Sequence, residues 1–286
     1  MLFGTLALAH HFCYGWSVAD ATEVMTTDLQ RRRRSDLPEF IQTELDVDAL
    51  ATEMFARYAG EQDIVVEGVT YTTTFFSPDY CPDLRVMKLA GTLALRVNQR
   101  AVESPDTVEP MRVTVPEIML AALLHDLGKQ HEDCAPFLQL LEQTDLRGAT
   151  TADAAARKQY LLGIVRDVHC RKGPCVIDRL ADAGRPELSN PFIVTVARRH
   201  GDDYEVNRCT KQGCWWAREI NVVTLADDYD AFTSEGPERA YKPDRLSNAD
   251  ALDLIRKGVA RGRYEPTLAQ IFIENVLGGR DSRPHF

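Results

Sequence analysis

The string HDLGK begins with His125 and Asp126, directly after an apolar run, and ends with Lys129. An imidazole nitrogen and a carboxylate oxygen are both common ligands of divalent transition metals. A lone His-Asp pair is nevertheless more often a hydrogen-bonded surface or core pair than a metal site. The pair therefore predicts a metal site only if distant residues bring further ligands to the same place.

Three more side chains of ligand type follow along the chain. His169 (VHCRKG) and His200 (ARRHGDD) are each expected at the end of a helix, shortly before a glycine. Asp227 lies in the apolar stretch INVVTLADDYDAF, where an unpaired buried carboxylate would be costly. A metal ion would remove that cost. Lys129 stands where its ammonium group would reach a phosphate.

The elements that must position these residues are predicted to be helices. From about residue 83 onward, apolar side chains recur at three-to-four spacing, as an amphipathic helix requires. Thr114 and Glu117 form a capping box with Pro116 in the first turn, so a helix begins there and delivers His125 at its far end. Gly128 then lets the chain leave helical geometry. Further helices are expected at 151–168, 174–183, 190–200, 215–233, 247–260 and 266–277.

The N-terminal part carries a different pattern. Residues 63–76, DIVVEGVTYTTTFF, are rich in Val, Thr and aromatic residues around a Glu-Gly pair, which predicts a β-hairpin. Residues 1–80 are therefore expected to form an N-terminal helical segment that includes this hairpin. We expect an all-α helical bundle over 81–280 and a short tail over 281–286.

The composition argues against several classes of protein. A net charge of −10 over 286 residues repels nucleic acid and anionic membranes, so a phosphate substrate needs local help from a metal or a cationic side chain. The arginine run at 31–34 is interpreted as a solvated linker for the same reason. Seven cysteines without a dense framework fit a reducing compartment, which predicts a cytoplasmic protein. The apolar opening MLFGTLALAHHF lacks a charged n-region, which favours a partly buried helix over a cleaved signal or a membrane span.

Several strings in the chain resemble the motifs of one enzyme family and occur in the family's order. They are LLHDLGK (123–129), VHCRKGPCVIDRL (168–180), the region around His200, VVTLADDYDAFTS (222–234), RAYKP (239–243), LSNADALDLI (246–255) and YEPTLAQIF (264–272). From about residue 82 to 277 the chain is similar to HD-domain metal-dependent phosphohydrolases, and it most resembles the HD-GYP branch.

The resemblance implies an all-helical domain that carries two or three transition-metal ions, usually iron or manganese. His125 and Asp126 would be ligands, and Asp126 would bridge two ions. His169 and His200 would bind the second ion, and Asp227 would complete the site. Mixed imidazole and carboxylate ligation independently suits Mn, Fe or Zn better than Mg or Ca. Metal-activated water would then hydrolyse a phosphoester or phosphodiester of a nucleotide or a cyclic dinucleotide.

Further residues are expected to bind this small phosphorylated substrate or to move protons. The residues predicted to contact its phosphate or base are Lys129, Arg199, Arg239, Tyr241 and Lys242. The predicted catalytic residues are Asp126, Lys129 and, as a proton shuttle, Asp203. The RAYKP string that supplies three of these residues matches a family segment close to the site.

The chain departs from the family pattern at its first metal ligand. Family members carry a histidine in the region that here reads Tyr80-Cys81-Pro82-Asp83, but no histidine occurs between positions 12 and 124. Asp83, Cys81 or His10 could take its place, or the first metal position is weakened. The Gly-Tyr-Pro string that names the branch is also absent, which puts cyclic di-GMP as the substrate in doubt.

Some alternatives stay open at this stage. His169 follows His125 by 44 positions, longer than the branch usually shows, so residues 131–155 are expected to form a lid or a partner surface. The pairs CRKGPC (170–175) and CTKQGC (209–214) are either zinc ligands or free thiols. The main alternative function is a catalytically degenerate HD-type sensor or interaction module. A nucleotidase from the wider HD group shares the metal site, and a homodimer is compatible with either function.

Overall fold

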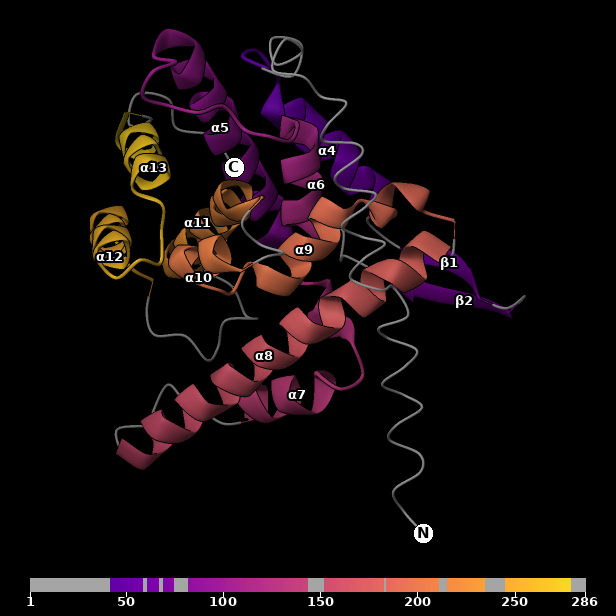
Figure 1. The fold of residues 1–286 in the computed structure, drawn as a ribbon. Helices are drawn as coiled ribbons and strands as arrows, with labels where there is room; N and C mark the ends of the chain where they lie inside the picture. Colours follow the sequence, from indigo (N-terminus) through magenta and orange to yellow (C-terminus); the bar gives the residue numbers. More distant parts are fainter. Residues whose placement is uncertain are drawn as a thin grey trace. The chain divides into compact units, whose positions relative to one another are not determined.

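The computed structural model describes residues 42–58, 61–66, 69–74, 82–143, 152–182, 184–210, 215–234 and 245–278. All of them belong to one compact unit, Gln42–Phe286 (Figure 1). Within this unit the described chain is helical except for one pair of strands. The predicted all-α fold class is therefore confirmed.

The compact unit begins earlier than the sequence indicated. Helix α4 (Val47–Tyr58) places Ala51 and Tyr58 in the main hydrophobic core. The Tyr58 hydroxyl also donates a hydrogen bond of 2.9 Å to Glu187. The boundary predicted near residue 80 thus lies inside the unit, because the chain before the hairpin already contributes to the core.

Three helices pack on one another at the centre of the core, and they are α5 (Pro82–Glu103), α6 (Val115–Leu124) and α11 (Ala217–Thr233). The predicted capping box begins α6, since Thr114 Oγ1 accepts from the Glu117 N–H and the Glu117 carboxylate accepts from the Thr114 N–H. Nearly every side of α11 is buried, and its buried residues include the polar side chains of Glu219, Asn221 and Asp230.

The remaining elements surround these three helices. They are η2 (Leu127–Gln130), α7 (Ala135–Gln143), α8 (Ala152–Asp182), η3 (Pro186–Ser189), α9 (Pro191–Arg199), α10 (Tyr204–Cys209), α12 (Asn248–Ala260) and α13 (Pro266–Gly278). Helix α9 packs against both α6 and α8, whereas α12 and α13 pack against α11. The helices α9, α11, α12 and α13 lie within two residues of their predicted bounds. The short helix α10 was not predicted.

Helix α8 is continuous over 31 residues, where the sequence predicted two helices with a break between them. The prediction was wrong because Pro174 lies inside the helix. A proline disfavours helical geometry in the residue before it, largely through a clash with that residue's Cβ, and Gly173 has no Cβ. His169 consequently lies within a helix and not at a helix end.

Helix α7 lies along the first half of α8 (Figure 1). The two helices share a small hydrophobic core of their own, in which Cys134, Leu141, Leu161 and Val165 are buried. The described part of the stretch 131–155, expected as a lid or a partner surface, is therefore a packed helical hairpin. It accounts for the long interval between His125 and His169.

The two strands pair in an antiparallel hairpin where one was predicted. They are β1 (Glu61–Val66) and β2 (Val69–Thr74), with Val66 opposite Val69. A two-residue connection is the commonest loop of a β-hairpin.

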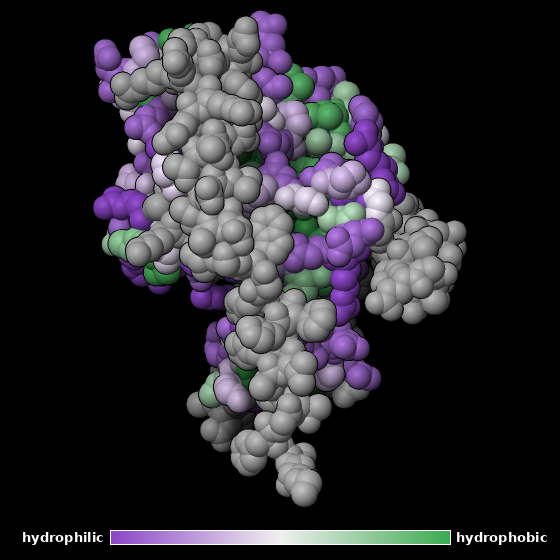
Figure 2. Space-filling model, turned by 45° about the vertical axis from the view of Figure 1, so that its right-hand side comes forward, coloured by the Kyte–Doolittle hydropathy of each residue, from purple (hydrophilic) through white to green (hydrophobic). Residues whose placement is uncertain are grey.

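The described surface is mostly hydrophilic on the face drawn in Figure 2, and hydrophobic residues are visible mainly between hydrophilic ones. The exposed large apolar side chains of the described ranges belong to four different segments and are Val102, Tyr160, Val206 and Trp215. None of the helices in these ranges is long and apolar enough to cross a membrane.

Candidate metal centre

Five side chains of ligand type that the sequence singled out lie together where α6, α8, α9 and α11 meet, and they are His125, Asp126, His169, His200 and Asp227. The two histidines at 125 and 200 are the C-terminal caps of α6 and α9, as predicted. Asp126 begins η2 without using its carboxylate as a cap, so the carboxylate faces the histidines.

Each of the three histidines is held in the tautomer that binds metals through Nε2. The Nδ1 atoms of His125, His169 and His200 lie 2.6, 2.8 and 3.1 Å from a carbonyl oxygen three or four residues earlier in the chain. Since a carbonyl oxygen can only accept, each Nδ1 carries the proton and each Nε2 faces the cluster. Metal-binding histidines are usually oriented by a contact of this kind.

The Nε2 atoms converge on the carboxylate of Asp126. Its Oδ1 lies 3.2 Å from His169 Nε2 and 3.6 Å from His200 Nε2, whereas its Oδ2 lies 3.5 Å from His125 Nε2. The His125 Nε2 atom also lies 3.6 Å from Asp227 Oδ1. Asp126 therefore links two parts of the cluster. We call His125, Asp227 and Asp126 Oδ2 the Asp227 half, and His169, Cys170, His200 and Asp126 Oδ1 the Cys170 half. The ligand nitrogen of His200 also lies within 4.8 Å of the ligand atoms of His125 and Asp227.

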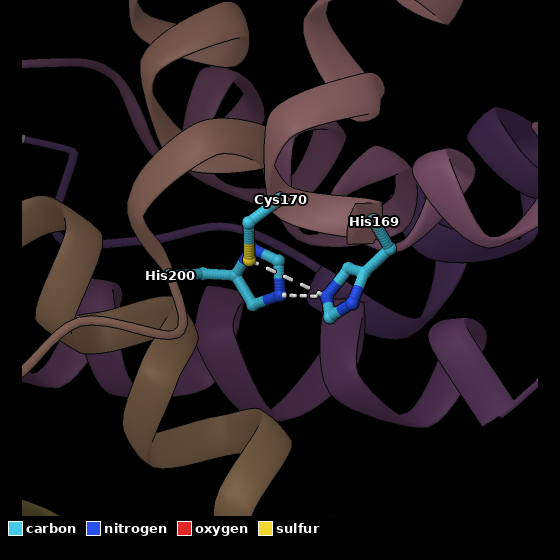
Figure 3. Close-up of side chains that lie close together, drawn as sticks. All are labelled: His169, Cys170 and His200. Atoms are coloured by element: carbon cyan, nitrogen blue, oxygen red, sulfur yellow. Dashed lines mark hydrogen bonds between the residues drawn. The ribbon is translucent and has the colours of Figure 1, made fainter. Parts of the chain in front are cut away.

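The contact between His169 and His200 shows that the cluster needs a positive charge. Their Nε2 atoms are 3.1 Å apart (Figure 3). Burial, which outweighs the attraction of Asp126, lowers the pKa of His169 to about 4, so this imidazole is neutral at pH 7. Two imidazole lone pairs repel at this separation unless a proton or a metal ion lies between them. The donor set therefore fits a divalent transition metal, which takes the place of that proton.

Both carboxylates of the cluster are ionised, as metal ligands must be. Burial alone would raise the pKa of Asp126, but Lys129 and then His125 hold it well below the usual range. Burial alone would raise the pKa of Asp227 as well, but the neighbouring His125 holds it well below the usual range.

The cluster is open to solvent on its carboxylate side. The side chains of His125 and His200 are 0% and 3% exposed, whereas that of Asp227 is 30% exposed. Lys129, on the same side as Asp126 Oδ2, is 37% exposed. The cluster can therefore be reached from solvent on the side of Asp227 and Lys129.

Two glycines allow the helices that carry the ligands to approach closely. A Cβ on Gly128 would overlap the carbonyl oxygen of His169 and lie 2.7 Å from the backbone nitrogen of Gly173, so η2 packs directly on the backbone of α8. A Cβ on Gly173 would lie 3.2 Å from Ala197 Cβ, at the contact of α8 with α9. The predicted role of Gly128 in ending a helix was wrong. It lies within η2, and the positive-φ glycines of the described ranges are Gly184 and Gly262.

The other predicted residues of the described part lie in or next to the cluster. The Lys129 ammonium binds Asp126 Oδ2. The Arg199 side chain, which precedes His200, pairs with Asp202 at 3.3 Å. The Asp203 carboxylate accepts a hydrogen bond of 3.2 Å from Arg263.

Several predicted residues lie outside the described part of the chain. They are the substrate-binding residues Arg239, Tyr241 and Lys242, and the candidate replacements of the missing histidine, His10 and Cys81. Asp83 lies in the first turn of α5, but its side chain is outside the described part as well.

The sequence indicated Cys170 only as one of the paired cysteines of CRKGPC and CTKQGC, either zinc ligands or free thiols. In the structure its Sγ lies 3.5 Å from His169 Nε2, and burial followed by Asp126 raises the pKa of the thiol to about 12. Cys175 is five positions further along α8, about 140° around the helix axis, so the two thiols point to different sides. Cys209 is exposed, and Cys214 lies outside the described residues. The position of Cys170 directly after His169 was the one signal of its role.

A partly buried ion pair beside the cluster was also missed. Arg263 donates to Asp228 Oδ2 from Nε at 3.0 Å and from Nη2 at 2.7 Å, and Nη1 donates to the carbonyl oxygen of Gly201 at 2.9 Å. The Tyr264 hydroxyl donates to the same Asp228 oxygen at 2.8 Å. Because Asp228 follows Asp227 and Gly201 follows His200, this network fixes the backbone next to two of the ligands.

We expect Arg263→Ala to lower the free energy of unfolding by about 3 kcal/mol, because it removes the main cation beside a mostly buried carboxylate. Burial already raises the pKa of Asp228 above its usual value in the presence of Arg263. Guanidinium denaturation measures the change. Arg100→Ala is the matched control, since its ion pair with Glu274 is about half exposed on both sides and should contribute less than about 1 kcal/mol. Equal losses in the two variants would contradict a special role of the Asp228 pair.

Neither the scan against models of known protein families nor the search of curated proteins finds a match to this chain.

Proposed function

We propose that this protein is a metal-dependent phosphohydrolase of the HD type, which cleaves a phosphoester or phosphodiester of a nucleotide or cyclic dinucleotide. One observation carries the proposal: the two oxygens of Asp126 face the two halves of a cluster that contains three buried histidines and a second carboxylate. The order of the strings that resemble HD-domain enzymes supports the same function.

The residues present fit a pair of transition-metal ions. His125, Asp227 and Asp126 would hold one ion, and His169, His200 and Asp126 would hold the other. Mixed nitrogen and oxygen donors suit iron, manganese or zinc better than magnesium or calcium. A bound metal supplies a water activated for attack at neutral pH and offsets the negative charge of the phosphate.

Lys129 is the residue of this chain that we assign to the substrate phosphate. Its ammonium binds Asp126 and lies on the open side of the cluster. With a metal bound to the Asp126 carboxylate, the Lys129 ammonium would be available to a phosphate oxygen. Arg199 and Asp203 have carboxylate and guanidinium partners of their own, so we assign them to holding the turn after α9.

The alternative function is a catalytically degenerate HD-type module that senses or binds a partner. The missing first histidine of the family pattern favours this alternative. Against it stands the retention of ionised carboxylates beside buried histidines, an arrangement that a scaffold without metal does not require.

Metal analysis combined with a substrate panel tests the proposal. The full chain is stripped with a chelator, reloaded with Mn²⁺, Fe²⁺ or Zn²⁺, and assayed on cyclic dinucleotides, nucleoside monophosphates and nucleoside triphosphates. We expect about two ions per chain and a hydrolysis that the chelator removes and metal restores.

Two other outcomes would overturn the proposal in different ways. Tight metal binding without turnover of any member of the panel would favour the degenerate module. A reloaded protein that retains no metal after desalting would overturn the hydrolase and leave the degenerate module as the remaining function.

A further inference from the structure

The Cys170 half contains a sulfur atom beside its two histidines. Cys170 Sγ lies 3.5 Å from His169 Nε2, and the sulfur and a ligand nitrogen of each histidine all lie within 4.8 Å of one another. Figure 3 shows the thiol and the two imidazoles converging, with Cys170 and His169 on one helix and His200 on another segment. Asp126 Oδ1, 3.2 Å from His169 Nε2, is a fourth donor on this side.

The separations of these four donors match those around a tetrahedral ion. Zinc binds nitrogen and oxygen at about 2.0–2.1 Å and sulfur at about 2.3 Å, so neighbouring ligands of a tetrahedral site lie about 3.3–3.6 Å apart. The distances in the Cys170 half are 3.1 Å between the two Nε2 atoms, 3.5 Å from Nε2 to Sγ, and 3.2 and 3.6 Å from Nε2 to Oδ1. Four of the six separations among the donors therefore match one tetrahedral shell, and the ligand atoms of His169, Cys170 and His200 all lie within 4.8 Å of one another.

The packing around Cys170 leaves room for the sulfur at this place. A Cβ on Gly201 would lie 3.3 Å from Cys170 Sγ, so a larger residue after His200 would press on the thiol. The hydroxyl of Thr224 donates at 2.8 Å to the carbonyl oxygen of His200, and Arg263 donates to that of Gly201 at 2.9 Å. The turn that faces the sulfur is thus fixed from two other elements.

We propose that Cys170 is a metal ligand, and that the Cys170 half binds Zn²⁺ through two nitrogens, one sulfur and one carboxylate oxygen. This inference rests on the proposed metal centre and assigns its two halves to different metals. Zinc displaces the thiol proton, which leaves to solvent, and a zinc–thiolate bond forms without any change of oxidation state. The Asp227 half has nitrogen and oxygen donors and takes the harder iron or manganese ion.

Zinc K-edge X-ray absorption of the full chain tests the proposal. Protein stripped of metal is reloaded with one equivalent of Zn²⁺, and we expect a zinc–sulfur distance of about 2.3 Å beside shorter bonds to nitrogen and oxygen. Cys170→Ser should lose the zinc–sulfur signal and weaken zinc binding by at least about 10-fold in chelator competition, with little effect on manganese. Cys175→Ser is the matched control on the same helix and should keep the signal.

The outcomes separate this inference from the proposed function. The role of Cys170 would be overturned if wild-type protein binds zinc without a zinc–sulfur signal, or if the Cys170→Ser variant keeps that signal. The proposed hydrolase would then remain, with nitrogen and oxygen ligands only. Protein that binds no metal would overturn both. The wild-type spectrum decides the question even if the serine variant does not fold.

Discussion

Asp126→Asn is expected to lower hydrolysis by about 10³-fold or more and to remove metal from both halves of the centre. One oxygen of Asp126 lies close to His125 and the other close to His169 and His200. An amide keeps the size of the side chain, but it lacks the negative charge and replaces one acceptor by a donor. Removing a ligand that belongs to one half would leave the metal ion of the other half in place. Removing the charge of Asp126, which both halves share, should affect both ions. Metal content after desalting and turnover of the best substrate in the panel measure the effect.

Asp133→Asn is the matched control for this change. Asp133 also lies next to a histidine, His131, and binds a lysine, Lys172, at 2.6 Å. Its carboxylate is about half exposed and forms its ion pairs with His131 and Lys172, outside the cluster, so metal content and turnover should stay at the wild-type level. An Asp126→Asn protein that retains both ions and full activity would show that the carboxylate does not join the two halves.

Helices that begin at a capping residue could be predicted from the sequence. Helix α6 begins at a capping box, and α9 and α12 begin at Asn190 and Ser247, whose side chains accept from backbone N–H groups. Such signals act within a few residues and need no knowledge of the rest of the molecule. The continuity of α8 could not be predicted in this way, because Pro174 indicates a break and the effect of Gly173 depends on the pair of residues together.

The ligands of the centre could be predicted as residue types but not as an arrangement. His125 and Asp227 attract attention because polar side chains in apolar runs need a partner. Which partner they find depends on the packing of α6, α8, α9 and α11, which no spacing in the sequence encodes. The same reason explains why Cys170 and the pair of Arg263 with Asp228 were missed. Arg263 lies 35 positions from Asp228 in the sequence, and His200 lies 30 positions from Cys170.

Gly128→Ala should destabilise the protein by about 3–5 kcal/mol, a large part of the stability of a typical domain. The added Cβ would overlap the carbonyl oxygen of His169 and lie 2.7 Å from the Gly173 nitrogen. Both obstacles are backbone atoms in the middle of α8, so no side chain can rotate away, and η2 and α8 must separate. Because η2 begins at Asp126 and α8 carries His169, we also expect metal affinity to fall. Chemical denaturation of the metal-free protein and chelator competition measure the two effects.

Gly163→Ala provides the control on the same helix. A Cβ on Gly163 meets no atom within 4 Å, and alanine favours a helix over glycine by about 1 kcal/mol, so this variant should be slightly more stable than the wild type. If Gly128→Ala lowers the stability and Gly163→Ala raises it, the loss at Gly128 comes from close packing and not from the added methyl group as such. A Gly128→Ala protein as stable as Gly163→Ala would mean that η2 does not lie against the backbone of α8. His169 would then not reach Asp126, and the Cys170 half would have no basis in the fold.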